Sequence, residues 1–299
     1  MSLVTQPPMS IAHFSSFLVE AIRLKNAFSY FSSQQLSSTS TTPRTSISSS
    51  KGDLWAGLWT RASLLNHSCT PNCARSFIGD MMILRAICDI PAGTELTHQY
   101  TSPEASFSAR EDIFAGNWNF KCECRLCAAE RNSEGTKHQQ RIALVKQIRD
   151  MATKHPQHQR IPDFAIRNIE RLLAEAEALH EPTTYSSIPR LLLVHPTIWL
   201  TTAHRSRREF SKVARYALEI LRNFGFVEPL RDGTLRLDYE RGIVNSEVFN
   251  ALQYAMEAFR ELGKGDLAAQ FEMEARRLYG IIMGHGEGFE DALLNEGNE

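Results

Sequence analysis

The chain has 299 residues, of which 42% are hydrophobic and 22% are charged, proportions that are usual for a globular protein. Its 33 lysines and arginines nearly balance its 34 aspartates and glutamates, which leaves a formal net charge of -1. This balance argues against direct binding of nucleic acid or anionic lipid through charge. No run of about 18 apolar residues occurs, so we expect no membrane-spanning segment, and the length favours two domains.

Six cysteines are too few in a chain of this length for a disulfide-stabilised scaffold. The N-terminus also lacks the basic patch and apolar stretch of a secretory signal, because the first basic residue, Arg23, follows Glu20. We therefore expect a reducing compartment, either the cytoplasm or the nucleus.

The first predicted element is a helix within residues 11–30, which ends near Lys25 and Asn26. Residues 32–50 follow, and Ser and Thr dominate them. Such a tract buries too little surface to offset the entropy lost on ordering, so it predicts a disordered insertion. The apolar positions that indicate the helix are Phe14, Phe17, Leu18, Ile22 and Leu24.

Short β-like runs separated by turns are predicted between residues 51 and 134. Gly79 and Asp80 form a pair suited to a two-residue hairpin turn, with strands expected at residues 74–78 and 81–86 on either side. The other elements predicted in this part are a turn at residues 90–93 and a short strand at residues 95–100.

From residue 138 onward, the apolar pattern has a helical period. Gly225 stops one helix, and a break at residues 263–265 separates two more, the second of which Asp266 can cap. This order resembles stacked repeats of the tetratricopeptide (TPR) type, although the consensus of the about 34-residue period is not visible. An all-α bundle without a repeat is the alternative. The stripes are Ile142, Val145, Ile148 and Met151; Ile169, Leu172, Leu173, Ala176 and Leu179; Phe210, Val213, Ala214, Ala217 and Leu221; Leu252, Ala255, Phe259 and Leu262; and Phe271, Ala275, Leu278 and Ile282.

Three polar segments stand out in the β-like part, and each has a plain structural explanation when it is taken alone. Residues 61–72 read RASLLNHSCTPN, residues 90–100 read IPAGTELTHQY, and residues 120–127 read FKCECRLC. The NHS triplet at 66–68 could form a polar turn, and Tyr100 could be a half-buried strand tyrosine.

In this order and at these distances, the three segments resemble the C-terminal half of a SET domain with its post-SET zinc loop, the fold of most protein-lysine methyltransferases. The CxCxxC spacing, with Phe120 two residues before the first cysteine, looks most like the SMYD branch and the fungal branch that joins SET to TPR. The resemblance covers about residues 11–134 by motif and 137–299 by architecture. It implies an α+β fold, in which the C-terminal part of a SET β-fold with a post-SET zinc loop precedes an all-α TPR-like helical domain.

A complete SET domain opens with a strand that carries a GxG motif, because close approach of the backbone to the cofactor requires glycines. Nothing before Asn26 matches this motif, so the resemblance is N-terminally incomplete. Two GxG strings occur late, at residues 263–265 and 284–288, and we interpret them as a helix break and a tail turn. The predicted organisation is an N-terminal SET-associated helical segment at 1–31, a disordered insertion at 32–52, the SET core with its zinc loop at 53–136, and the helical domain at 137–299.

Cys122, Cys124 and Cys127 lie within six residues, a crowding that suits a metal better than disulfides. Zinc in structural sites takes four ligands in a tetrahedron, so a fourth ligand must come from elsewhere, and both Cys69 and Cys73 are candidates. The family resemblance selects Cys69. Reduced surface cysteines, or a redox pair formed by Cys124 and Cys127, are the alternatives.

Such a metal ties the loop that carries Phe120 to the segment that carries Asn66 and His67, and so holds two walls of one pocket together. The resemblance implies that Asn66, His67 and Asn26 bind S-adenosylmethionine and that Phe120 stacks on its adenine. Tyr100 matches the family's catalytic, orienting tyrosine.

Transfer of a methyl group from a sulfonium to a lysine amine needs a deprotonated amine aligned in a dry channel. The resemblance implies a SET-type protein-lysine N-methyltransferase that uses S-adenosylmethionine and zinc and acts on a histone or non-histone protein. Because no GxG strand is matched, we expect its catalytic fold to be incomplete in this chain. The alternative is a non-catalytic, zinc-stabilised scaffold whose helices bind a peptide partner, whereas a zinc-ribbon nucleic-acid binder lacks the basic face that it needs. Glu95 is assigned a structural role and His98 none.

Overall fold

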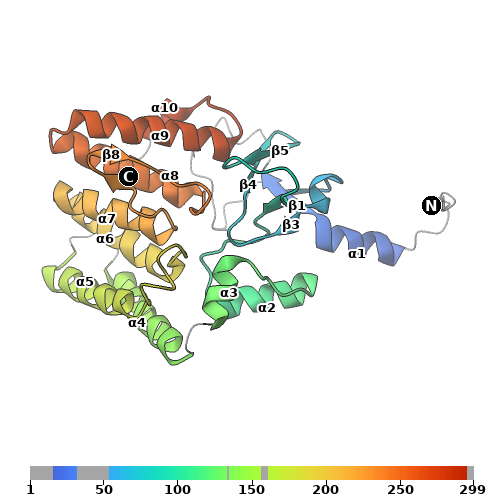
Figure 1. Cartoon of the computed structure of the whole chain (residues 1–299), viewed down its shortest axis with the longest axis horizontal. Coiled ribbons are helices and arrows are strands. Elements are labelled where there is room, and N and C mark those ends of the chain that lie inside the picture. The colour runs from blue at the N-terminus through green and yellow to red at the C-terminus, as the bar shows by residue number, and fades with distance from the viewer. Residues whose placement is uncertain (1–15, 32–53, 133–134, 156–160, 295–299) are drawn as a thin grey trace.

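The computed structural model describes residues 16–31, 54–132, 135–155 and 161–294, and Figure 1 shows a β-rich part beside an array of helices. The disordered insertion predicted at 32–52 lies outside the described residues, which resume at residue 54. The boundaries predicted for the four domains stay predictions. An α+β fold agrees with the described helices and strands.

Helix α1 spans Ser16–Asn26 and ends where the sequence predicts. The side chains of Ile22 and Leu24 are 40% and 65% exposed, so this part of the predicted apolar stripe does not face a core. Strand β1 (Phe28–Phe31) follows almost at once and pairs antiparallel with β2 (Leu54–Gly57). These two strands were not predicted, because four residues are too few for a clear period-2 pattern.

The predicted hairpin is confirmed. Strands β4 (Cys73–Ile78) and β5 (Met81–Ala86) pair antiparallel, with Ile78 opposite Met81. Gly79 has a φ of +60°, which lies in the left-handed region that the turn requires and that glycine adopts without steric cost.

Strands β3 (Asn66–His67) and β6 (Thr97–His98) form a parallel pair that brings two of the three polar segments together. The strand predicted over residues 95–100 is therefore only two residues long. The side chain of Asn72 replaces a ladder partner here, because its amide oxygen accepts the backbone N–H of Thr97 at 2.9 Å.

Two helices, α2 (Phe107–Trp118) and α3 (Arg125–Asn132), lie where only β-like runs and turns were predicted. The Ser106 hydroxyl caps α2 by accepting a backbone hydrogen bond from its first turn at 3.3 Å. Arg110 and Phe114 are the buried residues of α2, so the helix carries no continuous apolar stripe. A search for periodicity therefore could not find it.

The helices after residue 134 form consecutive pairs that lie side by side in chain order in Figure 1. The pairs begin at Gly135, Val194 and Ser246, which lie further apart than the about 34 residues of a TPR unit. The TPR-like repeat therefore stays a prediction. The helices are α4 (Gly135–Lys154), α5 (Asp163–Ala178), α6 (Val194–Ser206), α7 (Phe210–Asn223), α8 (Ser246–Glu261), α9 (Gly265–Met283) and the short α10 (Phe289–Leu294), and a small hairpin of β7 (Leu230–Arg231) and β8 (Thr234–Leu235) precedes α8.

The helix breaks that were predicted from glycines in this part are confirmed. The predicted cap of α9 and the predicted place of Leu262 in the apolar stripe of α8 are wrong. Gly263, with a φ of +72°, separates α8 from α9, and Gly284, with a φ of +79°, ends α9. The N-cap of α9 is Lys264, and Asp266 lies in its first turn, where a negative charge still favours the helix. Leu262 follows the end of α8 and is 40% exposed. The predicted stripe residues that are buried are Val145, Ile148, Ile169, Leu172, Leu173, Ala176, Val213, Ala214, Ala217, Leu221, Leu252, Ala255, Phe259, Phe271, Ala275 and Leu278.

One hydrophobic core joins the β-rich part to the helical array. Cys69, Phe114 and Leu126 belong to the same buried cluster as the apolar faces of α7, α8 and α9, while a second cluster lies among α4, α5 and α6. The side chain of Arg125, at the start of α3, donates to the carbonyl of Ser187 at 3.2 Å. The position of the cysteine loop therefore depends on the helices.

A second connection joins strand β5 to the end of α9. The guanidinium of Arg85 donates to the carbonyl of Gly284 at 2.7 Å. A Cβ at position 284 would lie only 2.6 Å from the hydroxyl oxygen of Ser76, so this approach needs a glycine for its space as well as for its φ. The hairpin and the last long helix thus form one packed unit.

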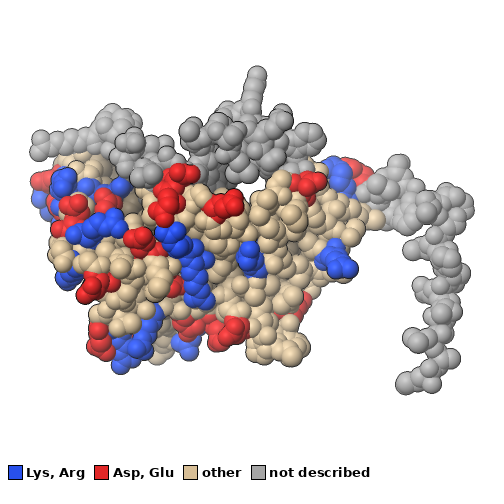
Figure 2. Space-filling model, turned by 90° about the horizontal axis from the view of Figure 1, so that it is seen from above, with Lys and Arg blue, Asp and Glu red and all other residues tan. Residues whose placement is uncertain are grey.

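No helix in the described part of the chain is long and apolar enough to cross a membrane. Figure 2 shows that basic and acidic side chains are interspersed on the face in view, mostly over the helical array. This mixture agrees with the net charge of -1.

Candidate functional site

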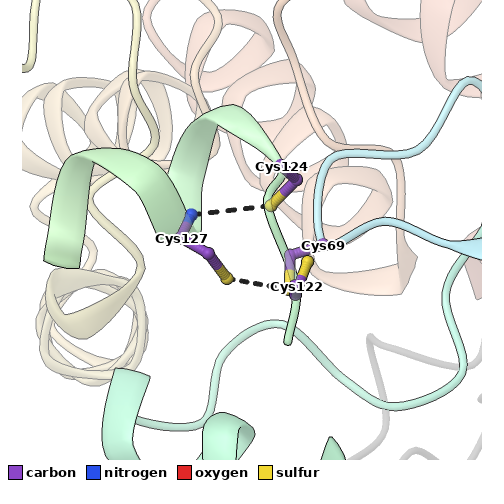
Figure 3. A group of neighbouring side chains, drawn as sticks. All are labelled: Cys69, Cys122, Cys124 and Cys127. Atoms are coloured by element: carbon purple, nitrogen blue, oxygen red, sulfur yellow. Dashed lines mark hydrogen bonds between the residues drawn. The ribbon is translucent and has the colours of Figure 1, made fainter. Parts of the chain in front are cut away.

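Four cysteine thiols converge where the β-rich part meets the helices (Figure 3). Cys69 follows β3, and Cys122, Cys124 and Cys127 come from the loop before α3 and from its first turn. All four sulfur atoms lie within 4.8 Å of one another, and those of Cys69 and Cys127 are 3.6 Å apart. A tetrahedral zinc with Zn–S bonds of about 2.3 Å separates neighbouring sulfurs by about 3.8 Å. The donor set therefore fits a structural zinc ion.

The cysteine cluster is too buried for reduced surface cysteines. Cys69, Cys122 and Cys127 are at most 3% exposed. Hydrogen bonds with the neighbouring thiols, first of all with Cys124, lower the pKa of Cys122, whereas hydrogen bonds with the other three, first of all with Cys122, raise the pKa of Cys69. Four thiolates repel one another in such a site unless a cation lies between them. The electrostatics thus suit a bound divalent metal.

The backbone also shapes the cluster. The sulfur of Cys124 accepts the backbone N–H of Cys127 at 3.5 Å, at the N-terminal end of α3. This position favours a thiolate, because a helix N-terminus carries partial positive charge. Cys73, the other candidate for the fourth ligand, lies in β4, and its thiol contacts the Asn72 side chain at 3.5 Å. The fold brings Cys69 to the loop and leaves Cys73 outside.

A buried arginine lies beside the cluster. Arg110 is 1% exposed, pairs with the carboxylate of Glu130, and places a guanidinium nitrogen 3.8 Å from the sulfur of Cys127. It also donates to the carbonyls of Pro103 and Ala105 at 3.0 and 2.5 Å. Burial by itself lowers the pKa of this guanidinium, but the nearby carboxylate and thiol charges raise it above its usual value. Arg110 therefore supplies a permanent positive charge to the cluster, a role that no sequence pattern indicated.

His67 lies between the cysteine cluster and Tyr100. The backbone N–H of Tyr100 donates to Nδ1 of His67 at 3.0 Å, and Nε2 of the same ring is 3.3 Å from the sulfur of Cys69. The Tyr100 hydroxyl donates to the carbonyl of Leu65 at 2.7 Å, and burial raises the pKa of this phenol. Cys69, His67 and Tyr100, which were predicted to bind the metal, bind the cofactor and orient the substrate, thus form one connected group.

Aromatic rings surround His67 and Tyr100. Phe114 and Phe120 stack with centroids 5.0 Å apart, and the His67 ring is 4.4 Å from the first and 6.0 Å from the second. Trp118 lies 5.1 Å from Tyr100. The faces of such rings attract ammonium and sulfonium groups. Phe114 and Trp118 were not predicted as site residues, because they lie on α2. A hollow of about 410 Å³ adjoins the rings and is lined by Glu111, Asp112, Ala115, Asn119, Phe120 and Lys121.

The two predicted asparagines lie at different places. Asn66 is exposed, and its amide donates to a carboxylate oxygen of Glu95 at 2.6 Å, which gives that glutamate a structural contact. Asn26 ends α1 and donates to a carbonyl of its own helix at 3.0 Å. The carbonyl of its neighbour Lys25 accepts the indole N–H of Trp118 at 2.9 Å. Asn26 therefore directly follows Lys25, whose carbonyl contacts the aromatic ring of Trp118.

His98, for which no role is predicted from the sequence, is buried, with 1% of its surface exposed. Its Nδ1 donates to the carbonyl of Gln99 at 3.0 Å, while its Nε2 finds no hydrogen-bond partner among the described residues. The rings of Phe28 and Tyr100 flank it at 5.6 and 5.1 Å. Burial, reinforced by the positive charge of Arg75, lowers the pKa of His98 to about 4. This histidine is therefore neutral at physiological pH.

The lowered pKa values of two buried histidines, His98 and His180, lead us to expect that the protein loses stability in acid. Burial lowers the pKa of both His98 and His180 to about 4. Below pH 6.5 the unfolded chain binds a proton at each site and the folded chain does not, so stability falls as the pH drops toward the folded pKa. We expect each histidine to lower the free energy of unfolding by about 2 kcal/mol between pH 7 and pH 5, measured by urea denaturation. In the variant His98→Asn, the free energy of unfolding should fall less between pH 7 and pH 5 than in the unaltered protein. An unchanged dependence on pH would contradict the prediction.

Part of this chain is similar to a known protein family. The SET domain family matches residues 12–101. A protein named "Methyltransferase" from Gibberella zeae is 35% identical over 150 residues, which cover 44% of this chain and 19% of that protein. "Histone-lysine N-methyltransferase SMYD3" from Homo sapiens is 37% identical over 78 residues, 26% of this chain and 18% of its own length. "Histone-lysine N-methyltransferase ASHR2" from Arabidopsis thaliana is 31% identical over 106 residues, which cover 32% of this chain and 27% of that protein.

The matched region covers β3, β6 and Tyr100, whereas three of the four clustered cysteines follow it. The matches span between 18% and 27% of the length of these three relatives. Residues 12–101 are therefore similar to the SET domain family, and the similarity to proteins named as methyltransferases supports that family for this part of the chain.

Proposed function

We propose that this chain acts in protein-lysine N-methylation as a SET-type enzyme that transfers a methyl group from S-adenosylmethionine to a lysine side chain. The observation that carries the proposal is the position of Tyr100 and His67, which lie among aromatic rings beside a buried four-cysteine cluster. Relatives named as histone-lysine methyltransferases match 78 and 106 residues of the chain, which supports a histone or non-histone protein as the methyl acceptor.

The cofactor-binding residues in this proposal are Asn26, Asn66, His67 and Phe120. The stacking of Phe120 on Phe114 supports a flat aromatic surface for the adenine, with centroids 5.0 Å apart. S-adenosylmethionine supplies an electrophilic methyl group on a positively charged sulfur. The surrounding rings favour that positive charge. Phe114 is buried and Phe120 and Trp118 are half-buried, so the rings shield part of this region from water.

The proposed zinc ion is structural. Cys69, Cys122, Cys124 and Cys127 would hold it with four thiolates, which would leave no open position for substrate. Their role is to hold the loop that carries Phe120 against strand β3. The reducing environment of the cytoplasm or nucleus, where we place the protein, keeps these thiols available for the metal.

Tyr100 orients the lysine amine in this proposal. Because burial raises the pKa of Tyr100, the phenol keeps its proton at neutral pH and does not serve as a general base. The amine therefore arrives deprotonated. Its lone pair forms the new N–C bond as the C–S bond breaks and its electrons return to sulfur, and the methylated ammonium later releases a proton to solvent. The hydrogen bond from the Tyr100 hydroxyl to the carbonyl of Leu65 keeps the phenol in place.

Zinc analysis and isothermal titration with S-adenosylmethionine test the proposal on the purified chain. We expect one zinc ion per chain and saturable binding of the cofactor. A metal-free protein that gives no heat with the cofactor would rule the proposal out for these residues.

The variant Tyr100→Phe is expected to lower methyl transfer by about 100-fold or more, because loss of one positioned hydrogen-bonding group typically costs about 10² to 10³ in rate. Its zinc content should be unchanged, since Tyr100 is not a ligand. The measurement is transfer of a radiolabelled methyl group to histones in a form of the protein that is active. Tyr185→Phe, in the helical array, is the matched control. An unchanged rate in Tyr100→Phe would remove this residue from the orienting role.

The helical array is proposed to present a peptide-binding surface beside the SET segment. The hydrophobic core that α7, α8 and α9 share with Phe114 and Leu126 favours a single folded unit over an independent scaffold. A peptide partner is therefore best sought with the full chain, by comparing capture before and after removal of the metal.

A further inference from the structure

We propose that His67 is a positioning residue that couples the metal state of the four-cysteine cluster to the backbone of Tyr100. The inference rests on the proposed function only in that the cluster holds a metal, and it does not require methyl transfer. It adds a role for the His67 side chain that is distinct from cofactor binding.

The hydrogen bonds on the two sides of the His67 ring define its tautomer. The backbone N–H of Tyr100 can only donate, so Nδ1 of His67, 3.0 Å away, presents its lone pair. In the neutral ring, the proton then lies on Nε2, which is 3.3 Å from the sulfur of Cys69. His67 therefore donates to the cluster with one nitrogen and accepts from Tyr100 with the other.

The ring has little freedom to satisfy these two partners in another way. His67 lies in β3, opposite His98 of β6, and the next residue extends the ladder with a hydrogen bond from Ser68 N–H to the carbonyl of His98 at 3.1 Å. Phe114 packs against the imidazole with centroids 4.4 Å apart, and Phe120 lies at 6.0 Å. A rotation of the ring would break both side-chain hydrogen bonds at once.

The chemistry of sulfur gives this contact its dependence on the metal. A thiolate bound to a divalent ion carries negative charge and accepts an N–H hydrogen bond well, whereas a neutral thiol is a weak acceptor. Ligand contacts of this kind orient the residues around a metal site. A metal at Cys69 thus holds the proton of His67 on Nε2 and the lone pair of Nδ1 toward Tyr100. The backbone that positions the Tyr100 ring then depends on occupancy of the cluster.

Two substitutions separate the two sides of the ring. His67→Gln keeps an N–H group near the place of Nε2 and loses the acceptor at Nδ1, whereas His67→Asn keeps an acceptor near Nδ1 and loses the donor to Cys69. The full chain is loaded with Co²⁺, whose thiolate charge-transfer absorption reports the sulfur environment. Selective ¹⁵N labelling of tyrosine gives seven amides for hydrogen exchange, of which Tyr254 in α8 and Tyr279 in α9 serve as internal controls.

In the His67→Gln variant, the Tyr100 amide should exchange its hydrogen at least about fivefold faster than in the unaltered protein, because that amide loses one hydrogen bond. The cobalt spectrum of this variant should stay unchanged. His67→Asn should shift the cobalt spectrum. Removal of the metal should speed exchange at Tyr100 in the unaltered protein by about fivefold or more, and by less than about twofold in His67→Asn, which lacks the donor to Cys69. Exchange at Tyr254 and Tyr279 should stay the same in both. His155→Gln, outside the site, should change neither readout.

The inference is overturned if His67→Gln leaves exchange at Tyr100 unchanged, or if both variants speed exchange at Tyr254 and Tyr279 as much as at Tyr100. The latter result would give His67 a general structural role. If the unaltered chain binds neither Co²⁺ nor Zn²⁺, the metal site of the proposed function fails and the coupling fails with it. If the chain binds metal and the variants behave alike, only the coupling is wrong.

Discussion

Replacing Cys69 with serine is expected to abolish stoichiometric zinc binding and to lower the free energy of unfolding by at least about 3 kcal/mol, since structural zinc sites contribute on the order of 10 kcal/mol. Cys69 is the one member of the cysteine cluster that comes from the β3 side, and its side chain is fully buried. Its loss therefore releases the loop with Cys122, Cys124 and Cys127 from the rest of the site. Elemental analysis and thermal denaturation measure the two effects.

Cys88→Ser is the matched control for this substitution. Cys88 is a free, half-buried cysteine outside the cluster, so its replacement should leave zinc content and the midpoint of unfolding nearly unchanged. A Cys69→Ser protein that keeps a full equivalent of zinc and unfolds at the same temperature would contradict the assignment of Cys69 as a ligand.

Replacing Arg110 with methionine is expected to lower the free energy of unfolding by about 3 to 5 kcal/mol, the usual cost of removing one partner of a buried ion pair. The side chain of Glu130 is 7% exposed and would lose the positive charge of Arg110. The carbonyls of Pro103 and Ala105 would also lose their donor. Urea denaturation at neutral pH measures the change.

Two further variants give this prediction its controls. Arg23→Ala removes an exposed arginine whose partner Glu20 is also exposed, so the midpoint of unfolding should stay the same. The double variant Arg110→Met with Glu130→Gln should recover part of the loss, because the buried negative charge that Arg110 balanced is also removed. An Arg110→Met protein that is as stable as Arg23→Ala would show that the buried pair does not support the cluster.

Features that depend on neighbouring residues could be predicted from the sequence. Gly79 and Asp80 identified the hairpin, the glycine at 263 marked the break between α8 and α9, and the apolar stripes located the long helices. The spacing of Cys122, Cys124 and Cys127 indicated a metal loop for the same reason, since all three side chains belong to one short turn.

Features that depend on tertiary contacts were not predictable. Helix α2 buries Arg110 and Phe114 under the cysteine loop, and its polar composition carries no signal of this. The burial of His98 follows from packing against Phe28, which lies far away in the chain. The choice of Cys69 over Cys73 required a family resemblance, because both precede the loop by similar distances and only the fold separates them.

The contact between Arg85 and Gly284 has a consequence for synthesis on the ribosome. These two residues are 199 positions apart, so at about 5 to 20 residues per second the hairpin emerges roughly 10 to 40 s before its partner is made. Long-range contacts of this kind also slow folding, because the loop between them must close first. During this interval the nascent hairpin lacks helix α9, against which β4 packs in the folded protein.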